Sequence, residues 1–143
     1  MSEIRTERLV LSRPSEFDLA DIAGLLADFS VARMLATVPH PHSLEHARAW
    51  LERVHRPDAD HRRIFAIGLD GRTVGSIGFR NRAGDPAIGY WLGKPYWGRG
   101  LMSEAARAAV GWFFPNMMRQ YFMPALLRII RHRRVFRKSL VSR

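Results

Sequence analysis

The chain has 143 residues, 47% of them hydrophobic, which is enough for one globular domain with a buried core. It contains no cysteine, which excludes disulfides, a thiol nucleophile and thiolate metal sites, and which fits a cytoplasmic location. No apolar run reaches the roughly 18 residues of a membrane span, and the first residues show no signal-peptide pattern, so we expect no membrane partner.

The net charge of +10 is concentrated near the C-terminal end of the sequence. Residues 1–114 carry 15 Lys and Arg against 13 Asp and Glu, whereas residues 115–143 carry 8 Lys and Arg and no acid. A native tail of this composition would bind nucleic acid or anionic lipid through non-specific electrostatics. Without such a tail, the sequence gives no reason to expect a nucleic-acid partner.

The first 56 residues predict one strand and two helices. Alternating polar and apolar residues predict a strand over Arg8–Arg13. Ser15 is placed to cap a helix over about residues 16–29, whose first turn is acidic. After a break rich in proline, Ser43 is expected to cap a second helix that runs to about Val54.

A hairpin is predicted next, with strands over Ile64–Leu69 and Val74–Arg80 joined by the turn residues Asp70 and Gly71. Gly75 and Gly78 interrupt the second of these strands. Glycine inside a strand marks either a bulge or a close approach of another backbone, so we expect one of these at each position.

The strand-to-helix junction that follows is the most informative part of the sequence. The apolar strand Ala87–Leu92 ends at Gly93, and a helix is expected over Leu101–Phe114. Gly98 and Gly100 stand just before this helix, where backbone N–H groups can converge without a Cβ in the way. The first N–H groups of a helix have no intrahelical partner and attract anions. The junction therefore predicts a pyrophosphate-binding loop, with a purely structural turn as the alternative.

The residues Trp97-Gly98-Arg99-Gly100-Leu101-Met102 resemble the acetyl-CoA signature of the GCN5-related N-acetyltransferases (GNAT), a Gln/Arg-x-x-Gly-x-Gly/Ala pattern. Trp97 replaces the usual Gln or Arg, and Met102 replaces the final small residue. Both departures are familiar in the branch resembling ribosomal-protein N-terminal acetyltransferases, where Ile-Gly-Tyr-Trp-Leu precedes Tyr-Trp-Gly-Arg-Gly. The stretch matches neither the dinucleotide glycine pattern nor a Walker A loop.

The resemblance implies that acetyl-CoA binds across this junction. In the family, the strand before the loop pairs its backbone with the pantetheine arm, although ordinary core packing is the alternative for its two aromatic residues. We expect Arg99 to bind through its backbone N–H and Glu104 to stabilise the helix dipole instead of acting in catalysis. The implied cofactor-binding residues are Tyr90, Trp91, Leu92, Trp97, Gly98, Arg99, Gly100, Leu101, Met102 and Ser103.

The sequence identifies no catalytic residue. Acetyl transfer needs a base or water chain for the amine, a donor to the thioester oxygen and a proton for the leaving thiolate. Family members often place a Glu where this chain has Ala87, and Asp85 lies in a turn. The six histidines show no metal-binding spacing, so no metal is expected. His40 and His42 lie in the loop that admits the acceptor in this family and are weak candidates for substrate contact.

The family resemblance stops after Phe114. The family continues with a strand, a helix carrying Asn-Pro-x-Ser and a final hairpin. Joining the last base of each codon to the first two bases of the next permits Met123–Val141 to read Ala-Gly-Val-Ala-Glu-Asp-Asn-Pro-Ala-Ser-Ser-Arg-Val-Gln-Glu-Lys-Leu-Gly-Phe, which resembles the missing signature. We therefore interpret residues 115–143 as a frameshift product, with a native basic tail that binds RNA or a membrane as the alternative.

These patterns together predict an α/β (α+β) GNAT-like acyl-CoA N-acyltransferase fold. We expect a mixed, mostly antiparallel sheet flanked by helices, with the C-terminal strands and fourth helix missing. Residues 1–114 would form an incomplete N-acetyltransferase domain and residues 115–143 a separate basic segment. Without the later strands, the helix face that carries Val110, Trp112 and Phe113 should lack its cover.

The implied function is transfer of an acetyl group from acetyl-CoA to a primary amine, on either a protein N-terminus or a small molecule. The altered C-terminal segment is expected to impair this activity. The alternative is a non-enzymatic CoA-binding remnant, or a basic protein that associates with RNA or the ribosome.

Overall fold

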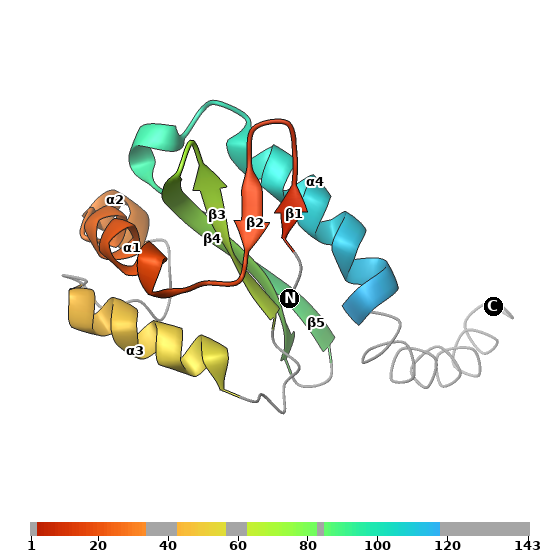
Figure 1. Ribbon diagram of the computed structural model, residues 1–143, viewed down its shortest axis with the longest axis horizontal. Coiled ribbons are helices and arrows are strands. Elements are labelled where there is room, and N and C mark those ends of the chain that lie inside the picture. Colours follow the sequence, from red (N-terminus) through yellow and green to blue (C-terminus); the bar gives the residue numbers. More distant parts are fainter. Residues whose placement is uncertain (1–2, 34–42, 57–62, 83–84, 118–143) are drawn as a thin grey trace, which may run out of the picture.

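A computed structural model describes residues 3–33, 43–56, 63–82 and 85–117 of the chain (Figure 1). Its centre is a five-stranded sheet with the strands in sequence order and every neighbouring pair antiparallel. The strands are β1 (Ile4–Arg5), β2 (Val10–Ser12), β3 (Arg63–Leu69), β4 (Arg72–Arg82) and β5 (Asp85–Leu92).

Helices cover both faces of this sheet (Figure 1). One face carries the helices from the first part of the chain, which are η1 (Glu16–Asp18), α1 (Leu19–Leu26), α2 (Phe29–Ala32) and α3 (Leu44–His55). The other face carries α4 (Leu101–Phe113), which follows the short helix η2 (Lys94–Tyr96). Each layer encloses its own apolar cluster, and the larger one lies between α4 and the sheet. No helix within the described ranges is long and apolar enough to cross a membrane.

The predicted order of strands and helices is confirmed, but two details differ. The helix expected over residues 16–29 is divided, because Asp28 has an extended backbone and accepts a hydrogen bond from the N–H of Ser30 at 2.9 Å, which starts α2. The short strand β1 was not predicted. It is only two residues long and is defined by its pairing with β2, so it carries no alternating pattern of its own.

The glycines of the hairpin behave as their positions predict. Asp70 and Gly71 have φ values of 50° and 79°, the left-handed pair that a tight two-residue hairpin turn needs. A Cβ on Gly75 would lie 2.3 Å from the carbonyl oxygen of Trp91, and one on Gly78 would lie 2.9 Å from that of Arg63. Both glycines therefore mark close backbone approaches, which packs β4 tightly between β3 and β5.

The expectation that the face of α4 would lack its cover is wrong for two of its three residues. Phe113 is buried and stacks on Phe79 with ring centroids 4.4 Å apart. Trp112 meets Phe65 edge-on at 5.2 Å. These rings pack because α4 turns them directly onto β3 and β4. Val110 remains 38% exposed.

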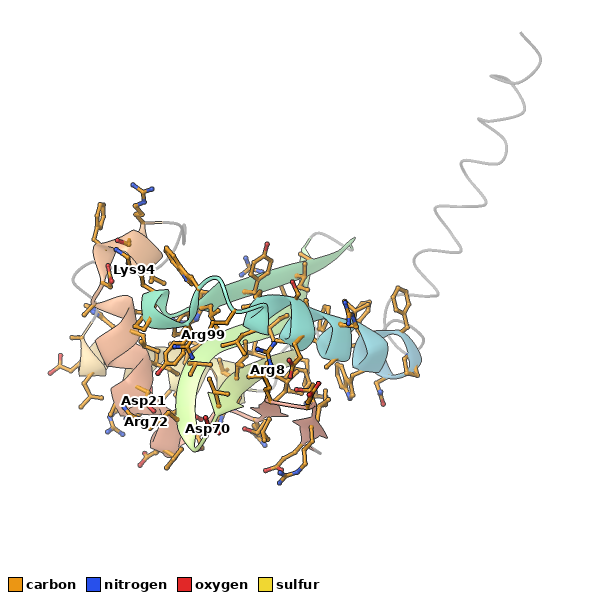
Figure 2. All side chains as sticks on the ribbon, turned by 90° about the horizontal axis from the view of Figure 1, so that it is seen from above. Arg8, Asp21, Asp70, Arg72, Lys94 and Arg99 are labelled. Carbon is orange, nitrogen blue, oxygen red and sulfur yellow. The ribbon has the colours of Figure 1, made fainter. Side chains whose placement is uncertain are left out.

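Two carboxylates attach α1 to the β3–β4 hairpin. Asp18 is buried and accepts hydrogen bonds from the N–H of Ser15 and the hydroxyl of Thr73. Asp21 accepts a hydrogen bond from the N–H of Thr73 at 2.9 Å and others from the guanidinium of Arg72. Asp21 and Arg72 are labelled in Figure 2. The hydrogen bond from Arg72, helped by the Thr73 N–H, lowers the pKa of Asp21 against the opposing effect of burial.

We predict that Asp21→Asn lowers the free energy of unfolding by about 1–2 kcal/mol at pH 7, because hydrogen bonds to a charged acceptor are lost. A lowered pKa means that the contribution of Asp21 is complete above the ordinary Asp value of about 3.9 and is lost as the pH falls through the folded-state value. Urea unfolding at pH 7 and pH 3 should show a difference between the two proteins that shrinks in acid. Asp70→Asn is the control, because Asn tolerates the positive φ of this exposed turn. A difference that is constant with pH would contradict the assignment.

Candidate functional site

The junction between β5 and α4 is closed by hydrogen bonds at its base. The N–H of Gly93 donates to the carbonyl of Val74 at 2.8 Å, which carries the chain past the end of β5. The indole N–H of Trp97 donates to the carbonyl of Leu92 at 2.7 Å. Trp97, one of the two residues that depart from the family signature, therefore ties the loop back to the strand that precedes it.

Gly98 and Gly100 give this loop its shape. Their φ values are +77° and +73°, and Gly100 is the N-cap of α4. No atom lies within 4 Å of a Cβ built on Gly98. Glycine is needed there because an L side chain strains a left-handed backbone, and not because a neighbour in the folded protein occupies the space. The first N–H groups of α4 lie directly after this turn and lack intrahelical partners.

A cavity of about 500 Å³ opens beside the loop. Nine of the ten residues predicted to bind the cofactor line it. Two further lining residues, Val31 of α2 and Tyr96 of η2, were not predicted. Val31 looks like any apolar residue of an amphipathic helix, so only the fold brings it to the site. The full lining is Val31, Tyr90, Trp91, Leu92, Tyr96, Trp97, Gly98, Gly100, Leu101, Met102 and Ser103.

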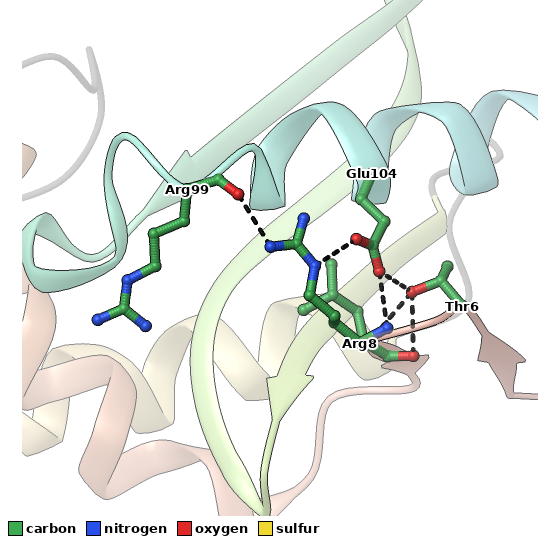
Figure 3. Close-up of polar contacts among 5 residues, drawn as sticks. Thr6, Arg8, Arg99 and Glu104 are labelled. Carbon is green, nitrogen blue, oxygen red and sulfur yellow. Dashed lines mark hydrogen bonds and ion pairs between the residues drawn. The ribbon is translucent and has the colours of Figure 1, made fainter.

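Arg99 is the predicted residue that does not line the cavity. Its guanidinium lies over the ring of Tyr96, 5.7 Å from the centroid. Its carbonyl oxygen accepts a hydrogen bond from Nη1 of Arg8 at 2.9 Å (Figure 3). The side chain of Arg99 therefore packs on the ring of Tyr96, and its backbone carbonyl is bound by Arg8 from the β1–β2 connection.

Glu104, in the first turn of α4, is bound to that same connection (Figure 3). Its carboxylate accepts from the hydroxyl of Thr6, from the backbone N–H of Arg8 at 2.9 Å and from Nε of Arg8 at 2.7 Å. The Thr6 hydrogen bond, followed by those from Arg8, lowers the pKa of Glu104 to about 2. Glu104 is therefore a carboxylate at neutral pH that ties α4 to the β1–β2 connection.

No carboxylate or imidazole is among the residues that line the cavity. Of the described histidines, His46 caps α3 by hydrogen bonding to Ser43, and His55 Nε2 lies 2.6 Å from the carbonyl of Pro14. His40 and His42 lie outside the described residues. Within the described part of the chain, no three His, Asp or Glu side chains are grouped so that they could hold a metal ion.

Comparison with known families gives one match over most of the chain. The family model for the acetyltransferase (GNAT) domain matches residues 8–139. A comparison with curated protein sequences found no match.

Several solved structures share the fold. A GNAT-family acetyltransferase from Bacillus anthracis superposes with a TM-score of 0.67 at 22% identity, over 81% of this chain and 68% of that one. A ribosomal L7/L12 alpha-N-protein acetyltransferase, RimL, in complex with coenzyme A gives 0.64 at 19% identity, over 78% and 67%. The microcin C7 self-immunity acetyltransferase MccE, in complex with acetyl-CoA and AMP, gives 0.62 at 16% identity, over 76% and 63%.

The chain thus spans about two thirds of the length of these structures. Their identities are low and show the shared fold, whereas the family model covers 132 of the 143 residues. The five-stranded antiparallel sheet with helices on both faces and the glycine loop before α4 agree with that match. The chain therefore belongs to the acetyltransferase (GNAT) family, the GCN5-related N-acetyltransferases.

Proposed function

We propose that this chain binds acetyl-CoA in the cavity beside α4 and transfers the acetyl group to a primary amine. The observation that carries the proposal is the left-handed pair Gly98 and Gly100 at the N-terminus of α4, opening onto a largely apolar cavity. The pyrophosphate would bind the N–H groups that begin α4, where the helix dipole favours negative charge. The pantetheine arm would lie along Tyr90, Trp91 and Leu92 at the exposed edge of β5.

The reaction joins an amine nitrogen to the thioester carbonyl carbon. The C–S bond then breaks, the amine loses a proton and the thiolate of CoA gains one. Among the described residues that line the cavity, the hydroxyls of Tyr90, Tyr96 and Ser103 are the side-chain groups that can carry a proton. These protons would therefore move through those hydroxyls, through water or through residues outside the described ranges. The described residues supply binding and orientation.

The acceptor is proposed as a primary amine of a protein N-terminus or of a small molecule. RimL supports the first choice through its activity on a ribosomal protein, and MccE shows a protein of the same fold in complex with acetyl-CoA and AMP. Val31 of α2 lines the cavity, and it stands three residues before Met34 in the sequence. We therefore place acceptor selection in the segment from Met34 to Ser43 and in α3, which follows it.

The C-terminal segment is proposed to be the product of a frameshift that impairs the enzyme. Ile88 and Tyr90 of β5 are 45% and 57% exposed, although they share a sheet face with the buried Phe79 and Ile77 opposite them. Among the described residues, β5 has a paired strand on one side only. The apolar surface beside α4 therefore supports a requirement for further strands. A protein that binds CoA without turnover is the second candidate, favoured by the same exposed surface.

We predict that Gly98→Val and Gly100→Val each weaken CoA binding about five- to thirtyfold, because the Val side chain obstructs the approach of CoA to the loop backbone. A left-handed L residue also costs about 1–2 kcal/mol, and binding must supply this free energy where the substituted loop relaxes in the free protein. Calorimetric titration with CoA measures this effect. Gly111→Val is the control, because Gly111 is exposed on α4 with open space around its Cβ position. Unchanged affinity in both loop variants would overturn the proposed site.

We predict that changing His40 and His42 together to Ala alters acceptor preference more than CoA affinity. The comparison uses kcat/KM for a panel of N-terminal peptides and small amines beside the dissociation constant for CoA. Arg5→Ala, which removes an exposed ion pair with Glu3 outside this segment, is the control. Equal losses in acceptor use and CoA affinity would indicate a folding defect and contradict the assignment.

We predict that shifting the reading frame of the same gene near the Phe114 codon yields a protein that melts cooperatively at higher temperature and turns over acetyl-CoA. Burying the exposed parts of Ile88, Tyr90 and Val110 would add roughly 1 kcal/mol each. Thermal unfolding and thiol release measure the two effects. Deleting residues 118–143 from the present chain should change neither property. If that deletion removes activity, the tail is native and the frameshift interpretation is wrong.

A further inference from the structure

Arg8 connects two parts of the sequence that lie 91 residues apart. It belongs to the connection between β1 and β2, on the side of the sheet that α4 covers (Figure 2). Its Nη1 donates to the carbonyl oxygen of Arg99 at 2.9 Å (Figure 3). Arg99 stands between the two left-handed glycines, so this hydrogen bond acts on the middle of the loop.

The direction of that carbonyl determines the direction of the next N–H. In a trans peptide the C=O of one residue and the N–H of the next point to opposite sides. When Arg8 holds the oxygen of Arg99, the N–H of Gly100 therefore points away from Arg8. Gly100 lines the cavity whereas Arg99 does not, which agrees with this orientation. A rotated 99–100 peptide would instead present a carbonyl oxygen where an anion needs a donor.

The guanidinium can hold this position because it is fixed on its other side. Nε of Arg8 donates to Oε1 of Glu104 at 2.7 Å, while Oε2 accepts from the Arg8 N–H and the Thr6 hydroxyl. Glu104 is only 18% exposed in its side chain, against 43% for Arg8. The planar guanidinium of Arg8 thus donates to two acceptors at once, the carbonyl of Arg99 in the loop and the carboxylate of Glu104 in α4. A lysine ammonium on its flexible side chain does not reproduce this geometry.

The same contact balances charge near the loop. Glu104 lies in the first turn of α4, close to the end that would receive a pyrophosphate. An unpaired carboxylate there would repel the ligand. Arg8 offsets that charge through direct contact.

We propose that Arg8 is a positioning residue of the acetyl-CoA site: it orients the Arg99–Gly100 peptide so that the Gly100 N–H faces the pyrophosphate. The inference rests on the proposed function, since it requires that CoA binds at this loop. On this proposal, Arg8 affects the binding of the phosphate-bearing part of CoA alone. Arg8 itself is not among the residues that line the cavity.

The test compares Arg8→Lys with the matched control Arg72→Lys, which alters a similar arginine–carboxylate pair on the far side of the sheet. Affinity for CoA is measured by calorimetry, and affinity for S-acetylpantetheine, which lacks phosphate, by NMR titration. For Arg8→Lys we expect CoA binding to weaken about tenfold, the effect of losing one oriented donor, and S-acetylpantetheine binding to change less than threefold. Arg72→Lys should change neither affinity by more than threefold.

Lysine keeps the positive charge of arginine. A loss of CoA affinity in Arg8→Lys without a loss of S-acetylpantetheine affinity would therefore reflect the geometry of the guanidinium hydrogen bonds and not the balance of charge. Thr6→Val is a gentler second variant that loosens the same cluster and should show the same selectivity with a smaller loss. Melting temperatures verify that each variant is folded. Equal losses for both ligands, or full CoA affinity in Arg8→Lys, would overturn the role of Arg8. If the unaltered chain binds no CoA, the proposed function itself fails.

Discussion

The turn from β5 into α4 is the constraint on which the rest of the site depends. Within eight residues the chain must leave the sheet, reverse across its edge and start a helix whose first N–H groups stay free. Two left-handed glycines make the reversal, and the indole of Trp97 closes its base on Leu92. A helix placed this way offers an anion site without any charged side chain in the cavity wall.

On each face of the sheet, a carboxylate that binds an arginine and a backbone N–H attaches a helix to the strands. A carboxylate of α1, Asp21, binds the guanidinium of Arg72 and a backbone N–H in the β3–β4 hairpin. A carboxylate of α4, Glu104, binds the guanidinium and backbone N–H of Arg8 beside β2. In each case a mostly covered carboxylate is satisfied by an arginine and an amide. Apolar packing positions the helices, and these contacts fix their register along the strands.

The edge at β5 is where the fold is least complete among the described residues. Ile88 and Tyr90 point to the same side as the buried core residues opposite them, yet α4 leaves them exposed. α4 packs its own aromatic rings on β3 and β4, which explains why the helix face is covered while the outer strand is not. This edge borders the cavity through Tyr90, so the outer strand forms part of the wall of the site.

The sequence by itself determined the features that depend on local backbone chemistry. The hairpin at Asp70 and Gly71, the cap at Ser43 and the glycine loop before α4 were all predictable, because each depends on a few consecutive residues and their preferred φ values. Of the cavity lining, nine residues came from one continuous stretch that the motif identifies.

Only the tertiary structure decided which distant residues support that stretch. Val31 lines the cavity with residues that begin at Tyr90, and Arg8 bonds the loop at Arg99 from 91 residues away, yet no local pattern marks either residue. The same holds for Glu104: its position in the first turn of α4 predicts a residue that stabilises the helix dipole, whereas its contacts with Thr6 and Arg8 are visible only in the tertiary structure. Local backbone conformation depends on neighbouring residues and can be predicted from them. The pairing of side chains from distant segments is determined only when the sheet brings those segments together.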